Sequence, residues 1–255
     1  MHRFFTRVAA GILLALVALV PLAPAIGQTP QMPPICQQLA FSTEEDFVTY
    51  GPEPPDGNPI ISDGDLLSVV PDPSGAIHCT ICARNADLLA QTFDVPFDLG
   101  LDAAYVIDAS AFLVAFSTEL NSPHVGQFTA GDLLITNGAS IPNQVLTARW
   151  QVGYDLGLDA VHLIGKPDQI RAFVDEAGQV SRDKWLTNPG LLFELLGAYK
   201  IDIWFSTEGT LGPSDNPTFL DGDLLSALTG TIVAGNDALL PPGVPAGIPS
   251  QGVDF

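Results

Sequence analysis

Basic residues are scarce in this chain. Only 9 of its 255 residues are Lys or Arg, against 29 Asp or Glu, and the formal net charge is −20. The five basic residues between positions 166 and 200 alternate with acidic ones, so they form no basic stripe. Binding to a phosphate backbone needs such a stripe, and a negative surface is repelled by anionic lipid. The composition therefore excludes nucleic acid and anionic membrane surfaces as partners.

Long apolar runs are also missing, apart from residues 9–20, which directly follow the basic Arg3 and Arg7. That run is shorter than the roughly 20 residues that a membrane span needs, and small residues typical of a cleavage site follow at 23–27. The order predicts a secretory signal peptide over residues 1–27, with an uncleaved membrane anchor as the alternative. Residues 28–255 would then form an exported protein with no further membrane span, extracellular, on the cell surface or in the periplasm.

Cysteine is rare as well, with Cys36, Cys79 and Cys82 the only three. In an exported protein two of the three are expected to form a disulfide, which predicts a bridge from Cys36 to Cys79 or Cys82 and one remaining thiol. A zinc site made by the three cysteines and His78 is the alternative. His78 and Cys79 are adjacent on an expected strand, however, and would point to opposite faces.

Signatures of catalysis are absent. His78, His124 and His162 are the only histidines after the leader; none lies in a His-Glu-x-x-His pattern, and no Gly-x-Ser-x-Gly elbow occurs. The sequence thus assigns no catalytic residue and no organic cofactor. Because carboxylates are plentiful, a pair assembled in space, as in glycosidases, leaves a secreted carbohydrate-active hydrolase as the alternative to a non-enzymatic protein.

What the chain does contain is an internal repeat. The tetrapeptide Phe-Ser-Thr-Glu occurs three times, at residues 41–44, 116–119 and 205–208. Each copy is followed by Gly-Asp-Leu-Leu, at residues 64–67, 131–134 and 222–225. An Asp-Leu-Gly-Leu-Asp-Ala segment stands at 98–103 and 155–160, and a degenerate Gly-Val-Asp-Phe version stands at 252–255. A fixed order of short motifs that returns three times indicates one supersecondary unit stacked on itself.

The repeats divide residues 28–255 into three units within one domain. The units span approximately residues 36–103, 104–165 and 201–255, and residues 166–200 form an insertion. Short apolar runs separated by turn residues predict about four antiparallel strands a unit, for example a hairpin made by 105–107 and 112–116. The insertion is predicted to hold a hairpin, made by 170–174 and 179–182, and a helix at 191–198. Few other helices are expected.

We therefore expect an all-β fold. Twenty-four glycines and 22 prolines suit a chain of many short strands and tight turns. A propeller-like arrangement is favoured because about 60 residues a repeat leave room for four strands and their loops. A trefoil-like barrel and a β-sandwich are the alternatives.

The order of Phe-Ser-Thr-Glu, Gly-Asp-Leu-Leu and Leu-Gly-Leu-Asp-Ala resembles that in a loose group of exported bacterial proteins with β-repeats of unassigned activity. The resemblance covers residues 41–254. It implies export and a β-repeat fold, and it supplies no activity or site residue.

Acidic residues recur at fixed places in the repeat. Asp65, Asp132 and Asp223 follow the glycine of Gly-Asp-Leu-Leu, and Asp102 and Asp159 stand in Leu-Gly-Leu-Asp-Ala. Carboxylates on turns suit Ca²⁺, which takes six to eight oxygens, so these five are the candidate metal ligands. The alternative is that they accept hydrogen bonds from turn backbone. We thus expect an exported, non-enzymatic binding or structural module, with Ca²⁺ as the possible stabilising ion and an extracellular protein or carbohydrate as its ligand.

Overall fold

The computed structural model describes residues 32–43, 45–50, 54–71, 74, 77–213 and 215–239. Within them the chain forms four small antiparallel sheets and six α-helices, and the sheets do not close into a barrel. The predicted all-β fold is therefore confirmed only in part, because the described chain is mostly β but also contains helices. The leader at 1–27, Glu44 and residues 252–255 lie outside the described residues.

The second and third units are each one four-stranded antiparallel sheet with the strands in sequence order. The second unit contains β5 (Ala104–Asp108), β6 (Leu113–Phe116), β7 (Leu133–Ile135) and β8 (Ser140–Ile141). The third unit contains β9 (Ala160–Ile164), β10 (Asp202–Ser206), β11 (Leu224–Ser226) and β12 (Thr231–Ala234). Because β9 pairs with β10, residues 160–164 belong to this unit and not to the second unit predicted at 104–165. In these two units four strands a repeat is the observed number.

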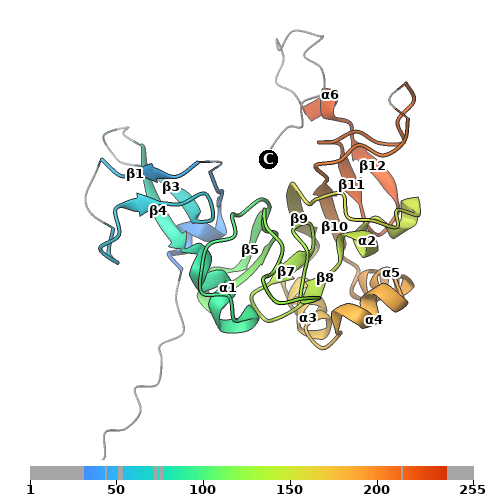
Figure 1. Ribbon diagram of the computed structural model, residues 1–255, viewed down its shortest axis with the longest axis horizontal. Helices are drawn as coiled ribbons and strands as arrows, with labels where there is room; N and C mark the ends of the chain where they lie inside the picture. Colours follow the sequence, from blue (N-terminus) through green and yellow to red (C-terminus); the bar gives the residue numbers. More distant parts are fainter. Residues whose placement is uncertain are drawn as a thin grey trace, which may run out of the picture.

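The first unit is less regular. Its main sheet is the hairpin of β3 (Leu66–Pro71) and β4 (Ile77–Ala83), and Phe41 bridges to β3 from a segment that follows η1 (Pro34–Gln37). The short β1 (Phe47–Val48) and β2 (Ile60–Ile61) pair with each other in a separate sheet. Figure 1 shows this unit in blue and cyan, with the green second unit and the orange and red third unit following it in order.

The repeat in sequence is also a repeat in strand register. In every unit the Phe of Phe-Ser-Thr-Glu stands opposite the second Leu of Gly-Asp-Leu-Leu. The pairs are Phe41–Leu67, Phe116–Leu134 and Phe205–Leu225. Since a slip of one residue would turn every side chain to the other face, the shared register gives equivalent residues equivalent directions in all three units.

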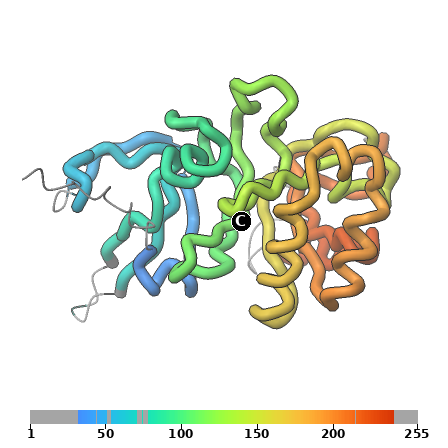
Figure 2. The backbone as a smooth tube through the Cα atoms, turned by 90° about the horizontal axis from the view of Figure 1, so that it is seen from below, coloured from blue at the N-terminus to red at the C-terminus, as the bar shows by residue number. Residues whose placement is uncertain are grey.

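The sheet of the second unit is covered on both faces. Leu134 and Phe116 belong to an apolar cluster shared with the first unit, whereas Leu133 and Ile135 belong to a cluster shared with the third unit. Successive side chains on a strand point to opposite faces, which is why β7 is apolar at every position. The tube in Figure 2 shows the green middle part of the chain between the blue and the orange parts.

The insertion is helical throughout, so the hairpin predicted at 170–174 and 179–182 is wrong. Its helices are α3 (Pro167–Ala177), α4 (Arg182–Thr187) and α5 (Gly190–Tyr199), and α5 confirms the helix predicted at 191–198. Proline opens α3 at a position where a missing N–H costs nothing. Ile170, Phe173, Val174 and Ala177 are buried with helical spacing, so the apolar residues that suggested a strand form one face of a helix.

Further helices connect the units. They are α1 (Asn85–Phe93), α2 (Asn143–Leu146) and α6 (Asn236–Leu239), with short turns η2 (Ala109–Ala111) and η3 (Ala148–Trp150). The nine residues of α1 were not expected. Leu88, Leu89 and Phe93 are buried on one side of it, and Asp94 ends it in the left-handed conformation. None of the helices in the described part of the chain is long and apolar enough to cross a membrane.

Candidate functional site

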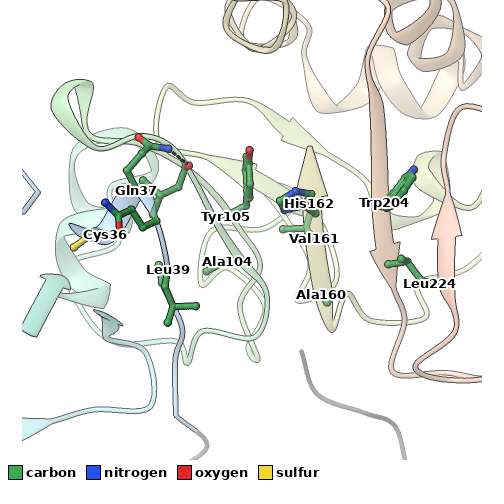
Figure 3. A pocket seen from close by; sticks show the side chains of 13 residues that line it. Cys36, Gln37, Leu39, Ala104, Tyr105, Ala160, Val161, His162, Trp204 and Leu224 are labelled. Carbon is green, nitrogen blue, oxygen red and sulfur yellow. Dashed lines mark hydrogen bonds between the residues drawn. The ribbon is translucent and has the colours of Figure 1, made fainter. Parts of the chain in front are cut away.

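All three units contribute to one pocket of about 430 Å³, which we call the three-unit pocket (Figure 3). Its described lining comprises residues 36–40 from the first unit, 104–106 from β5, 160–162 from β9, and Trp204 and Leu224 from β10 and β11. The strands that begin the second and third units thus meet the N-terminal segment here. The pocket exists only because three separate repeats converge.

Three ring-bearing side chains line this pocket, namely Tyr105, His162 and Trp204. Tyr105 and His162 hold equivalent positions in β5 and β9, and their ring centroids are 4.6 Å apart in an edge-to-face contact. Trp204 stands opposite His162 in the β9–β10 register. Its indole N–H donates to Asp202 Oδ2 at 3.1 Å, which fixes the orientation of the ring. Figure 3 shows Tyr105 next to His162, with Trp204 on the neighbouring strand of the same sheet as His162.

The described lining of the pocket holds no Asp, Glu, Lys or Arg, although the chain has 29 acidic residues. Partial burial lowers the pKa of His162 and raises the pKa of Tyr105, which favours the neutral form of both rings. Gln37 fixes the N-terminal wall, since its amide donates to the Val106 carbonyl at 2.8 Å and accepts from the Ala109 N–H at 2.9 Å. The arrangement offers rings and amides to an uncharged ligand.

Trp204 is unusual among its equivalents. The register places it at the position of Ala115 in the second unit, where a small side chain, fully buried, packs into the apolar cluster shared with the third unit. On the third unit the same face is open and carries a half-buried indole. The sequence analysis did not point to Trp204.

The aspartates of the three Gly-Asp turns accept hydrogen bonds from backbone. Asp65, Asp132 and Asp223 each take the N–H of the residue three positions earlier and the N–H of an asparagine that follows the last strand of the unit. The hydrogen bonds from the residue three positions earlier are 3.1, 3.2 and 2.9 Å long, and those from the asparagine N–H are 3.2, 3.3 and 2.8 Å long. All three are buried. Each therefore ties a turn to the end of its own unit.

Two of these aspartates also form an ion pair with an arginine. Arg84 reaches Asp65 Oδ2 at 2.5 Å and Arg182 reaches Asp132 Oδ2 at 2.6 Å. Arg182 opens α4, so this ion pair fastens the helical insertion to the second unit. The residues that the structure describes contain no group of three or more His, Cys, Asp or Glu side chains able to hold a metal ion. The structure does not gather these turn carboxylates into one site.

Asp102 and Asp159 lie in an acidic cluster with Glu119 and Glu208, separate from the Gly-Asp turns. Burial and the neighbouring carboxylates, Glu208 first, raise the pKa of Asp102 to about 8. Asp159 instead accepts a hydrogen bond from the Ser206 hydroxyl at 2.9 Å. The glutamates come from two Phe-Ser-Thr-Glu motifs and the aspartates from two Leu-Gly-Leu-Asp-Ala motifs. The cluster therefore marks where those motifs meet.

The glycines of the loops at 98–103 and 155–160 explain how the glutamates can come so close to these loops. Gly100 and Gly157 have φ of +72° and +76°, a conformation that favours glycine. A Cβ at Gly100 would lie 2.6 Å from the Glu119 carboxyl carbon, and one at Gly157 would lie 2.3 Å from Glu208 Oε1. The third glutamate of the series, Glu44, lies outside the described residues.

Sequence analysis missed the residues that hold these loops. Asn85 and Asn143 are buried; their side-chain oxygens accept the N–H of Leu99 at 3.0 Å and of Leu156 at 2.9 Å. Their amide groups donate to the carbonyls of Gly100 and Gly157 at 3.3 and 2.8 Å. A signal was present in the sequence, because Asn-Ala-Asp-Leu-Leu at 85–89 returns as Asn-Asp-Ala-Leu-Leu at 236–240.

The predicted disulfide from Cys36 is confirmed. Cys36 of η1 is bridged to Cys82 of β4, with Cα atoms 5.9 Å apart, and Cys79 is a free, exposed thiol. Because the bridge fixes residues 36–40, it holds one wall of the three-unit pocket. No family model, curated protein or solved structure matches this chain.

Proposed function

We propose that this protein is an exported, non-enzymatic binding module whose three-unit pocket holds a neutral sugar ring of a glycan. The observation that carries the proposal is the row of Tyr105, His162 and Trp204 along a pocket whose described lining has no charged side chain. Aromatic faces with a few amide groups suit a ring that is apolar on its faces and polar at its edge. The disulfide supports export, because such bonds persist in oxidising compartments.

A propeller-like arrangement of the three units around this pocket belongs to the same proposal. Its support is the ring contact between Tyr105 of β5 and His162 of β9, which brings the first strands of two sheets together. In propellers, the first strands of neighbouring blades also lie close together, around the central channel.

The test is a titration of the full chain with cellohexaose and chitohexaose, followed by tryptophan fluorescence and calorimetry. We expect saturable binding of at least one of them, weakened about tenfold by Trp204→Ala, because a ring contact is worth up to about 1.5 kcal/mol beyond the apolar area that it buries. Tyr154→Ala is the matched control, since Tyr154 is an exposed aromatic outside the pocket lining. Equal affinity in the wild type and Trp204→Ala would refute the proposed site.

One observation favours the hydrolase alternative, namely the raised pKa of Asp102 beside Glu208. Two coupled carboxyls are the material of acid catalysis. These two side chains are hydrogen-bonded to each other, however, whereas the carboxyls of glycosidases stand about 5 Å or more apart. Release of reducing sugar from either hexasaccharide, abolished by Asp102→Asn, would favour hydrolysis over binding alone.

A further inference from the structure

The third unit has the same asparagine as the first two, but its described residues do not include a loop held by that asparagine. The backbone N–H of Asn236 donates to Asp223 Oδ1 at 2.8 Å, as Asn85 and Asn143 do to their own turn aspartates. Asn236 is 4% exposed. Its side-chain oxygen has no hydrogen-bond partner among the described residues, and its amide makes only a long contact of 3.4 Å to the Asp221 carbonyl.

An unpaired oxygen at this depth is costly. A buried acceptor without a donor loses the hydrogen bonds that water would have given it, and native proteins satisfy nearly all such groups. In the other two units the same oxygen is satisfied by one kind of partner, the backbone N–H before a left-handed glycine. The position therefore fits an extended backbone segment that presents an N–H and, one residue later, a glycine carbonyl.

The chain itself contains such a segment. Gly252-Val253-Asp254 repeats the Gly-Leu-Asp of the two bound loops. Gly100 follows Asn85 by 15 residues and Gly157 follows Asn143 by 14, and Gly252 follows Asn236 by 16. By this spacing Gln251 takes the place of Leu99 and Leu156, the residues whose N–H groups bind the asparagine oxygen.

We propose that Asn236 is the docking site of residues 250–254 of the same chain. The Gln251 N–H donates to the asparagine oxygen, and the asparagine amide donates to the Gly252 carbonyl. The segment closes the third unit as the loops at 98–103 and 155–160 close the first and second. A repeat protein needs such a cover on its terminal unit, since each unit otherwise relies on its neighbour.

The primary test is hydrogen–deuterium exchange of the full chain, read by mass spectrometry on peptides that cover residues 246–255. We expect exchange at least tenfold slower than in the same synthetic peptide free in solution. Asn236→Ala should return it to the free rate, whereas Asn216→Ala, which removes an exposed asparagine of the same unit, should leave the protection intact. Exchange at the free-peptide rate in the wild type overturns the proposal.

A second variant keeps the test independent of the folding of Asn236→Ala. Gly252→Ala should release the segment, because an added Cβ at the equivalent glycines would strike a glutamate and the conformation there is left-handed. Ala246→Ser, outside the motif, is its control. Each releasing variant should lower the Tm by about 2–5 °C, and the double variant should lower it no further. Additive effects overturn the proposal, as does protection that depends on protein concentration, because docking would then occur between two copies.

Discussion

Single residues in this protein act mainly through buried hydrogen bonds at the places where motifs meet. Asp223 and Asn236 are one such buried pair, whereas Asp102 lies beside Glu208, an exposed glutamate. The first pair satisfies backbone groups, but the second brings two carboxyls together, which is unfavourable when both are charged. The pH dependence of stability should therefore originate at Asp102.

We expect the wild type to lose stability as the pH rises from about 4 to 8. The folded-state pKa of Asp102 is raised to about 8, above its ordinary value, so the folded state keeps a proton that the unfolded state releases near pH 4. The stabilisation that this proton gives the folded state is complete below pH 4 and disappears as the pH passes 8. After allowance for solvent screening of a partly exposed group it is about 1–2 kcal/mol, roughly 3–6 °C in Tm.

The measurement is a series of thermal melts between pH 4 and 9 at constant ionic strength. Asp102→Asn should reduce the decline in Tm with rising pH, because an amide has no carboxyl proton to release. Asp87→Asn is the control, since Asp87 lies in the first turn of α1, away from the cluster. Parallel curves for wild type and Asp102→Asn would assign the pH dependence elsewhere.

At the scale of elements, the first and second units are each closed by a loop pressed against the Gly-Asp turn of that unit. A Cβ at Gly64 would lie 2.0 Å from Asp98 Oδ1, and one at Gly131 would lie 2.1 Å from Asp155 Oδ1. The same glycine thus admits the same loop carboxylate in two units. Glycine is required here by close approach.

Gly131→Ala should destabilise the protein by about 2–3 kcal/mol, because the added methyl also comes within 2.8 Å of the Gly157 backbone and the loop must move. Gly197→Ala is the matched control. It lies in α5 with nothing within 4 Å of an added Cβ, so it should be neutral or stabilise by up to about 1 kcal/mol. Urea unfolding compares the two variants, and equal stabilities would contradict the close approach at Gly131.

At the scale of the whole molecule, the units are joined by shared apolar clusters and the N-terminal segment is joined by a disulfide. Leu133 and Leu134 face different clusters although they are neighbours in β7. Residues 36–40 are held beside β4 and the pocket by the Cys36–Cys82 bond together with the Gln37 hydrogen bonds. Loss of that bond should weaken both stability and the pocket.

Cys36→Ser should lower the free energy of unfolding by about 2–4 kcal/mol, since a bridge over 46 residues restricts the unfolded chain. Cys79→Ser removes an exposed thiol and should change it by less than about 0.5 kcal/mol. Urea unfolding with and without dithiothreitol measures both, and the reductant should have no effect on Cys36→Ser. A large effect of Cys79→Ser with none of Cys36→Ser would contradict the pairing.

The sequence by itself determined the repeat, most of the strands and the choice of cysteines for a bridge, because turn residues, alternating apolar positions and motif order act over short distances. It assigned residues 170–174 to a strand, wrongly, since only burial against α5 and the sheets of the second and third units makes the helical spacing decisive. The roles of Asp65, Asp132 and Asn85 were decided by tertiary structure, as their partners lie 11 to 50 residues away. Trp204 became a site residue for the same reason: its face is open only because nothing described covers the third unit as that unit covers the second.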